Sequence, residues 1–342
     1  IDLSIIVFGM HLQKQHGKKI KEIISDNYFN NIFKVNGMPF GDSKLDISKG
    51  YGELVQSFSK FWNKNIFDLV FALGDRFEMS AAVQAGLPYE LKLAHIHGGE
   101  ISLGSIDNIY RDQISVASQL HFTSTLDAAK RLKKLLIDKK FVYNVGSLSI
   151  DKLDIQTLPK WEIICNNFNI PNKPFVLITF HPETVGTEKN ESYIKVLYKS
   201  LSELSKSIHL IITQANADSS GKLYIEMNLS LKKENSNNIS IVESFGKTNY
   251  FAAIKNSVFL LGNTSSGIIE AASFGKYVLN VGKRQHGRTR SKNIIDVDFD
   301  KKEILKNSKL LLIKSKYKGK NNYKMKNTSE NILRHTLNYL NR

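Results

Sequence analysis

A serine-rich turn at 262–267, Gly-Asn-Thr-Ser-Ser-Gly, separates an apolar run of strand-forming residues from a stretch with helical spacing. The first N–H groups of a helix have no partner inside the helix, and they lie at the positive end of its dipole. In a strand-turn-helix arrangement, Ser265, Ser266 and Gly267 would bring unpaired N–H groups close to a bound phosphate. The alternative is that these residues only cap the helix, which is a common use of such turns.

A basic loop at 282–288, Gly-Lys-Arg-Gln-His-Gly-Arg, follows the next predicted strand and favours the phosphate interpretation. The carboxyl ends of two strands then point to one place, which is where an open α/β sheet binds its ligand. Glu270 comes one turn into the helix after the serine-rich turn. Its carboxylate would repel a phosphate placed directly on it, so its better use is to accept hydrogen bonds from ribose hydroxyls, as acidic residues do in other nucleotide sites.

Ionisable side chains also follow the apolar strands of the first half of the chain. Asp75, His97, Glu100, Asp107 and Arg111 come just past such strands or on the first turns of helices. Carboxylates that are crowded together raise one another's pKa, so that one acts as an acid near neutral pH while another stays a base. Structural roles are the alternative for single residues: Asp75 and Asp107 as helix N-caps, the latter with Arg111 as its ion-pair partner.

These side chains need alternating strands and helices to position them, and the apolar patterning predicts such a series. In the first half, strands are predicted at 4–8, 67–73, 92–96, 120–123 and 141–145, and helices at 13–25, 51–62, 77–85, 107–118 and 125–136. In the second half, strands are predicted at 175–180, 209–213, 239–243, 258–261 and 277–281, and helices at 191–205, 248–255 and 329–340. The run at 67–73 is nearly continuous in its apolar residues, as in strands that are buried on both faces of a parallel sheet.

The series predicts an α/β fold with two doubly wound, Rossmann-like domains at 1–150 and 151–325, and a C-terminal helix within 326–342 that packs back across them. A chain of 342 residues also suits two domains better than one core. The chain begins with Ile1, and a strand follows almost at once. We therefore expect that a preceding segment with a first strand is missing.

Composition narrows the class of protein. Cys165 is the single cysteine, which excludes an internal disulfide and fits the reducing cytoplasm. No apolar run approaches the roughly 18 residues of a membrane span, so we expect no membrane partner.

The net charge of +16 raises the possibility of nucleic-acid binding. The lysines are scattered, however, with no helix-turn-helix spacing and no zinc ligand set, so the charge indicates a solvated, lysine-rich surface and we expect no nucleic-acid partner. An anionic small-molecule substrate would gain from the positive field in either case.

Seven short blocks, taken together and in order, resemble the hydrolysing UDP-N-acetylglucosamine 2-epimerases. They are Gly74-Asp75-Arg76-Phe77-Glu78, His95-Ile96-His97-Gly98-Gly99-Glu100, Ile106-Asp107 with Arg111, His121-Phe122-Thr123-Ser124-Thr125, His181-Pro182-Glu183-Thr184, the serine-rich turn through Glu270, and the basic loop. The resemblance implies a GT-B-type pair of Rossmann-like domains with a nucleotide sugar in the interdomain cleft, a homodimer, and a reaction without a nicotinamide cofactor or a metal. It also implies a place in a sialic-acid-like or related nonulosonate pathway.

The implied reaction is the anti elimination of UDP across C1 and C2 of the sugar, followed by hydration of the glycal to N-acetylmannosamine. The candidate acids and bases, taken as a group, are Asp75, His97, Glu100, Asp107 and His181. The candidate substrate-binding residues are Arg111, Asn216, Asn263, Ser265, Ser266, Gly267, Glu270, Arg284, Gln285 and Arg288. Some relatives carry Glu where His97 stands, and Asn108 stands where an acidic residue is common, so the residue that takes the C2 proton is left open.

Four alternatives remain at this point. Related enzymes act on UDP-N,N'-diacetylbacillosamine, and these motifs do not distinguish the two sugars. A non-hydrolysing 2-epimerase would return UDP to the glycal, and a GT-B glycosyltransferase would need an acceptor. A nucleotide-sugar sensor would bind UDP without turnover.

Overall fold

The computed structural model describes residues 1–12, 24, 29, 31–37, 41, 43–183, 185, 187–214 and 221–342. Most of the helix predicted at 13–25 lies outside these residues, as does Asn216. The chain divides into two compact units. The first comprises Ile1–Gly99, Asp107–Asn144 and Ile332–Arg342, and the second comprises Glu100–Ile106 and Val145–Asn331.

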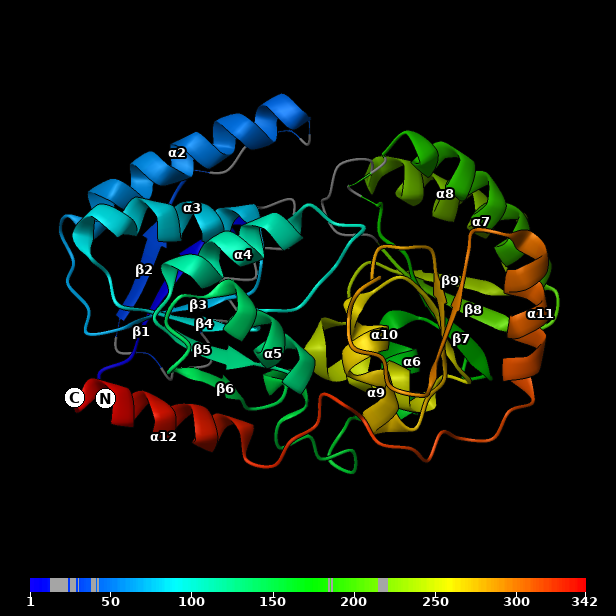
Figure 1. Cartoon of the computed structure of the whole chain (residues 1–342). Coiled ribbons are helices and arrows are strands. Elements are labelled where there is room, and N and C mark those ends of the chain that lie inside the picture. The colour runs from blue at the N-terminus through cyan, green and yellow to red at the C-terminus, as the bar shows by residue number, and fades with distance from the viewer. Residues whose placement is uncertain are drawn as a thin grey trace. The chain divides into compact units, whose positions relative to one another are not determined.

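The first unit contains parallel strands that are covered by helices (Figure 1). Strands β1 (Ser4–Phe8) and β2 (Asn31–Val35) form one sheet, and β3 (Val70–Leu73), β4 (Leu93–Ile96), β5 (Leu120–Thr123) and β6 (Val142–Asn144) form another in that order. The helices are α2 (Lys44–Trp62), α3 (Phe77–Gly86), α4 (Asp107–Ala117) and α5 (Leu126–Leu135), with 3-10 turns at Gly9–Leu12 and Leu87–Tyr89. One core packs Leu54, Phe58 and Trp62 of α2 against Phe77 and Ala81 of α3.

Two elements of this unit differ from the prediction. Helix α2 starts seven residues earlier than its apolar spacing indicated, because Ser43 and Asp46 form a capping box that starts the helix in a polar stretch. Strand β3 is shorter than the run at 67–73, and it is not buried on both faces. Its Ala72 is buried, whereas Phe71 and Leu73 on the other face of the strand are 40% and 57% exposed.

The second unit contains six parallel strands in the order β12-β11-β10-β7-β8-β9. These are β7 (Phe175–Thr179), β8 (His209–Thr213), β9 (Ile239–Val242), β10 (Leu260–Gly262), β11 (Val278–Val281) and β12 (Ile294–Val297). The helices are α6 (Trp161–Phe168), α7 (Asn190–Ser205), α8 (Gly221–Glu234), α9 (Gly246–Asn256), α10 (Ser265–Ile269) and α11 (Lys301–Leu312), with 3-10 turns at Leu148–Ile150, Thr187–Lys189 and Ala271–Phe274. Helix α12 (Thr328–Leu340) begins in this unit and continues into the first.

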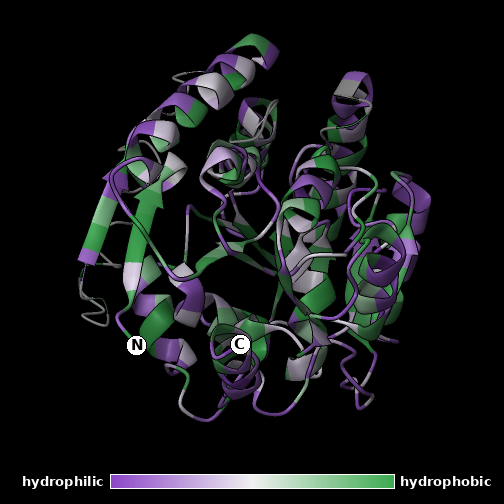
Figure 2. Ribbon diagram, turned by 60° about the vertical axis from the view of Figure 1, so that its left-hand side comes forward, coloured by the Kyte–Doolittle hydropathy of each residue, from purple (hydrophilic) through white to green (hydrophobic). Residues whose placement is uncertain are grey.

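Helices cover both faces of this sheet, which makes the unit doubly wound (Figure 1). Residues of α7, α8 and α11 pack on one face, and residues of α6 and α9 pack on the other. Figure 2 shows that hydrophobic residues are concentrated in the strands, while the helices carry both hydrophobic and hydrophilic residues. The strand order reverses between β7 and β10. In an open α/β sheet, the carboxyl ends of the strands at such a reversal form the ligand-binding crevice.

One short segment falls in a different unit from the one that the predicted boundary at residue 150 would give. Segment Glu100–Ile106 belongs to the second unit, because the Leu103 N–H donates to the His286 carbonyl at 2.9 Å and Gly104 lies so close to Arg284 that a Cβ would come within 2.5 Å of its Cα. Most of α12, from Ile332 onward, belongs to the first unit, where His335 stacks on Tyr143 with ring centroids 3.7 Å apart. Among the described helices, none combines the length and the apolar composition needed to cross a membrane.

Candidate functional site

The strand reversal of the second unit brings the β7 and β10 ends very close together. A Cβ on Gly262 would lie 1.9 Å from the Thr179 carbonyl oxygen, so this position requires glycine. The next residue, Asn263, is fully buried and uses its whole amide group on the backbone of His181. Its Oδ1 accepts the His181 N–H, and its Nδ2 donates to the His181 carbonyl, both at 2.8 Å. Asn263 therefore fixes the backbone that carries a candidate acid–base group.

The serine-rich turn forms as predicted, but its N–H groups are not all unpaired. Helix α10 begins at Ser265, with Thr264 as its N-cap. The Thr264 hydroxyl accepts the Ser266 N–H at 3.4 Å, and the Thr264 carbonyl accepts the Gly267 N–H at 3.2 Å. The expectation of unpaired N–H groups at Ser266 and Gly267 is therefore corrected, because the cap uses both. The cap does not use the Ser265 N–H, and a helix of five residues adds little dipole.

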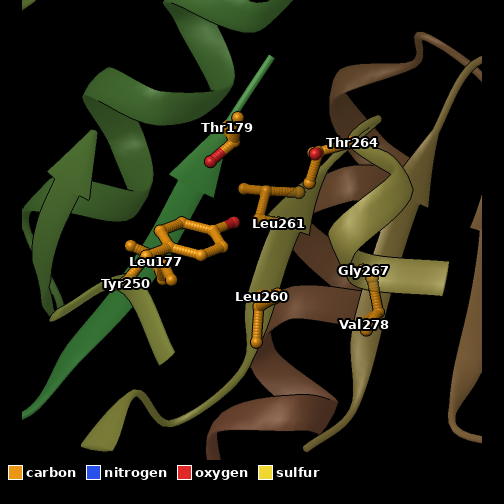
Figure 3. A pocket seen from close by; sticks show the side chains of 9 residues that line it. Leu177, Thr179, Tyr250, Leu260, Leu261, Thr264, Gly267 and Val278 are labelled. Atoms are coloured by element: carbon orange, nitrogen blue, oxygen red, sulfur yellow. The ribbon is translucent and has the colours of Figure 1, made fainter. Parts of the chain in front are cut away.

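A small cavity lies under this turn, lined by Thr179, Tyr250, Leu261, Thr264 and other residues of β7, β10 and β11 (Figure 3). Its volume is about 10 Å³, which suits one water molecule and not a nucleotide. Tyr250 of α9 packs against the core, and its ring also lines this cavity (Figure 3). Burial, together with the nearby Glu270 carboxylate, raises the pKa of the Tyr250 hydroxyl, so it stays protonated.

The basic loop carries three candidate ligand-binding side chains, and two of them contact Asn263. Gln285 Nε2 donates to the Asn263 carbonyl at 3.0 Å, and Arg284 Nη1 donates to the same oxygen at 3.5 Å. Arg288 forms an ion pair with Glu100, and only 10% and 4% of the two side chains are exposed. Glu100 therefore lies beside the basic loop of the second unit, although the sequence grouped it with the carboxylates of the first half.

Glu183 is a residue of this site that the sequence reasoning did not select. It is buried, and its Oε1 accepts the Lys283 N–H at 2.7 Å, so it joins the loop after β7 to the basic loop after β11. A Cβ on Gly282 would approach the same oxygen to 2.8 Å. Asn190 holds the Glu183 backbone from the other side through two hydrogen bonds. The sequence signal was its place after His181 and Pro182 at a strand end, inside one of the seven blocks that carry the family resemblance.

In the first unit, Asp75 and Arg111 form an ion pair at the carboxyl end of β3. The Arg111 side chain is 1% exposed and that of Asp75 is 26% exposed. Arg111 Nη1 also donates to Asn108 Oδ1 at 3.2 Å. The alternative of Asp75 as an N-cap is excluded, because Arg76 holds that position in α3. Separating the pair would leave a buried positive charge without its anion, which costs several kcal/mol of stability. This free-energy cost keeps the Asp75 carboxylate next to Arg111.

His97 and Asp107 follow at the ends of the next elements. His97 comes directly after β4 and has a φ of +67°, a left-handed conformation that is uncommon outside glycine. Its N–H donates to the Phe122 carbonyl at 2.9 Å, which fixes it against β5. Strain of this kind is concentrated at functional sites. Asp107 is the first residue of α4. His97 therefore lies at the end of β4 and Asp107 at the start of α4, in the same unit as the Asp75–Arg111 pair.

Glu270, the candidate ribose ligand, follows α10 directly. It is 8% exposed, and its N–H donates to the Ser266 carbonyl at 3.0 Å. Its carboxylate is close enough to raise the pKa of Tyr250. In the described ranges, no group of three or more His, Cys, Asp and Glu side chains has the arrangement of a metal site.

Acid is expected to destabilise the protein through three buried histidines. Burial lowers the pKa of His95 from 6.5 to about 3, and those of His121 and His209 from 6.5 to about 4. The neutral side chains therefore stabilise the fold fully above pH 6.5, and this contribution is lost as the pH falls toward 4. Each histidine lowers the free energy of unfolding by about 1.4 kcal/mol per pH unit in that window. Urea unfolding at several pH values measures the slope, and a midpoint that stays constant below pH 6.5 contradicts the expectation.

Comparison with known proteins gives concordant results for sequence and fold. The family model for UDP-N-acetylglucosamine 2-epimerase matches residues 1–337. A GDP/UDP-N,N'-diacetylbacillosamine 2-epimerase (hydrolyzing) from Campylobacter jejuni is 33% identical over 309 residues, which are 88% of this chain and 78% of that protein. A UDP-N,N'-diacetylbacillosamine 2-epimerase (hydrolyzing) from Legionella pneumophila is 31% identical over 334 residues, which are 96% of this chain and 86% of that protein.

Among solved structures, the UDP-GlcNAc 2-epimerase from Neisseria meningitidis bound to UDP-GlcNAc has a TM-score of 0.74 at 18% identity, and the match covers 98% of this chain and 99% of that one. At this identity the likeness shows the fold, which is the two-unit α/β fold of GT-B type. The prediction of two Rossmann-like units is confirmed. The match over nearly the whole chain shows that this protein belongs to the UDP-N-acetylglucosamine 2-epimerase family.

Proposed function

We propose that the protein is a hydrolysing 2-epimerase that converts UDP-N-acetylglucosamine and water to N-acetylmannosamine and UDP. The observation that carries the proposal is that ionisable side chains gather at the carboxyl strand ends of both units, with a basic loop in one and a buried Asp75–Arg111 pair in the other. The hydrolysing type is further supported by the names of the Campylobacter and Legionella relatives.

The proposed reaction has two steps. A base takes the proton from C2 while the C1–O bond breaks, and UDP leaves with the bonding electron pair, which gives a glycal. Water then adds across the C1–C2 double bond and places its hydroxyl on C1 and a proton on C2. The proton reaches C2 from the face opposite to the one that lost the original proton, which inverts C2. Both steps need groups that exchange protons and groups that stabilise the negative charge of the departing diphosphate.

The residues divide between these two tasks. We assign proton transfer to Asp75, His97, Glu100, Asp107 and His181 as a group. We assign the diphosphate to the Ser265 N–H and the Arg288 guanidinium, and the ribose to Glu270. Arg284 and Gln285 lie beside Asn263 and keep their substrate-binding roles in the proposal. Asn263 acts through the His181 backbone, since both of its amide groups are used there.

UDP-N,N'-diacetylbacillosamine is the second candidate substrate, and the names of the Campylobacter and Legionella relatives favour it. The same elimination and hydration would apply, because the two sugars differ away from C1 and C2. The homodimer and the cytoplasmic location that the family resemblance implies stay predictions.

Proton NMR of the full-length protein in deuterated water tests the proposal, with each nucleotide sugar supplied in turn and no acceptor added. Free N-acetylmannosamine with deuterium at C2, together with UDP, is the expected result for UDP-N-acetylglucosamine. Turnover of the diacetylbacillosamine nucleotide alone would establish the second substrate. An epimerised UDP-sugar with no free hexosamine would establish the non-hydrolysing reaction. Binding of UDP with both sugars intact would overturn the enzymatic proposal and favour a sensor.

A further inference from the structure

His95 is a fully buried side chain on β4 that makes two well-defined hydrogen bonds. Its Nε2 lies 2.8 Å from the Gly74 carbonyl oxygen, and its Nδ1 lies 2.9 Å from the Ser115 hydroxyl. A carbonyl only accepts, so Nε2 carries the hydrogen. Burial lowers the pKa of the ring to about 3, so the ring is neutral and Nδ1 accepts the hydrogen of Ser115. The two partners therefore fix both the tautomer and the orientation of the ring.

The two bonds connect the segments that carry the Asp75–Arg111 pair. Gly74 directly precedes Asp75 at the end of β3. Ser115 lies one turn after Arg111 on α4, so both side chains are on the same face of that helix. The imidazole thus links the backbone next to the carboxylate with the helix that carries the guanidinium.

The loop after β4 packs on the same imidazole–hydroxyl pair. A Cβ on Gly98 would come 2.8 Å from His95 Nδ1 and 2.9 Å from Ser115 Oγ, so the loop approaches this pair as closely as a residue without a side chain permits. Gly98 directly follows His97, the candidate acid–base residue with the left-handed backbone. His95 therefore contacts or supports three segments, and each of them carries a proposed catalytic or substrate-binding side chain.

We propose that His95 is a positioning residue for the 2-epimerase reaction, which sets the geometry of Asp75, Arg111 and His97 through Gly74, Ser115 and Gly98. It exchanges no proton with the substrate itself. The inference rests on the proposed function, because two of the residues that it positions, Asp75 and His97, are assigned there to proton transfer. A displacement of about 1 Å in such groups costs roughly 100-fold in rate.

His121 is a matched control for the loss of a buried histidine. It lies on the neighbouring strand β5, directly opposite His95 in the parallel register. It is also buried, and burial also lowers its pKa, to about 4. Its Nδ1 has no hydrogen-bond partner among the described residues. His121 therefore has the burial of His95 without its links to the strand-end loops.

The test compares His95→Leu, His95→Gln, Ser115→Ala and His121→Leu for kcat, KM, UDP affinity and Tm. For His95→Leu we expect kcat to fall by roughly 100-fold while the affinity for UDP stays near wild type, because the proposed diphosphate ligands lie in the second unit. His95→Gln keeps a donor for the Gly74 carbonyl and should recover part of kcat. Ser115→Ala should lower kcat by less than His95→Leu. His121→Leu should lower Tm and leave kcat near wild type.

Equal kcat in the two leucine variants would overturn the positioning role. If His95→Leu does not fold, Ser115→Ala and His95→Gln still test the positioning role, because unchanged kcat in both variants contradicts it. A wild-type protein that turns over the nucleotide sugar shows that the proposed function holds even when the positioning role fails. If the wild type turns over neither nucleotide sugar, the hydrogen exchange of the Arg111 guanidinium by NMR tests the positioning alone. Faster exchange in His95→Leu than in His121→Leu supports it, and equal exchange contradicts it.

Discussion

Replacement of Asp75 by asparagine is expected to lower kcat by about 10²- to 10⁴-fold, the range that a single acid–base group contributes. Asparagine has the shape of aspartate and can still accept a hydrogen bond from Arg111, but it cannot take a proton. The effect should appear in kcat, and KM should change little, because the proposed diphosphate ligands are untouched. Steady-state release of UDP from the preferred nucleotide sugar measures both constants.

The same substitution should also destabilise the first unit. The Arg111 side chain is 1% exposed, and its anionic partner would be lost. Breaking a buried ion pair costs about 3–5 kcal/mol, and we expect the lower end because 26% of the Asp75 side chain is exposed. The double variant Asp75→Asn with Arg111→Met should regain stability, since the buried guanidinium is removed together with the carboxylate charge, but it should not regain activity. Urea unfolding of the two variants separates the catalytic loss from the loss of stability.

Asp112 provides the control, because it lies beside Arg111 on α4 and forms a second aspartate–arginine pair, with Arg131 of α5. Its two carboxylate oxygens accept from Arg131 at 2.7 and 2.6 Å, and 26% and 27% of the two side chains are exposed. Asp112→Asn should cost about 1 kcal/mol or less and leave kcat unchanged. A folded Asp75→Asn variant with the turnover of wild type would remove Asp75 from the proton-transfer group.

Local pattern predicts much of this fold because strands and helices depend on nearby residues. The strand at 4–8 has its predicted bounds, and the strand ends carry the predicted polar side chains. Strand β12 and helix α11 were not predicted. In β12, Asp296 interrupts a short apolar run. In α11, lysines separate the apolar residues, so the helical periodicity of the apolar positions is weak. The early start of α2 depends on a capping interaction between Ser43 and Asp46, which hydrophobic periodicity does not register.

Partner choice within the site is less accessible from sequence, because it depends on which distant segments the fold brings together. The pattern placed Arg111 next to Asp107 on one helix, whereas the structure pairs it with Asp75, 36 residues away. It grouped Glu100 with the first-half carboxylates, whereas the structure pairs it with Arg288. His95 lies in one of the seven blocks, and its side chain is fully buried. Its bonds to Gly74 and Ser115 were not foreseeable from spacing alone.

The Glu100–Arg288 pair leads to the second large effect, which concerns the binding of UDP. Arg288 pairs with Glu100 through Nη1, and its Nε is buried without a hydrogen-bond partner in the part of the chain that the structure describes. A phosphate oxygen would satisfy that donor, but it must compete with the carboxylate for the positive charge. Arg288→Ala should therefore lower kcat/KM by about 10²- to 10³-fold, as the loss of one charge-stabilising donor does elsewhere.

Glu100→Gln should have the opposite effect on binding, because the guanidinium keeps its charge and loses its competing anion. We expect UDP to bind about tenfold more tightly, which corresponds to about 1.4 kcal/mol, while kcat falls if Glu100 exchanges protons in the reaction. Asp296→Asn is the matched control, since Asp296 accepts from Arg290 at 3.1 Å in a more exposed pair next to the same loop. Calorimetric titration with UDP compares the three variants. Two results would show that Glu100 does not restrain Arg288: weaker UDP binding in Glu100→Gln, or an equal gain in UDP affinity in Asp296→Asn. The diphosphate would then have to be assigned to other donors of the second unit.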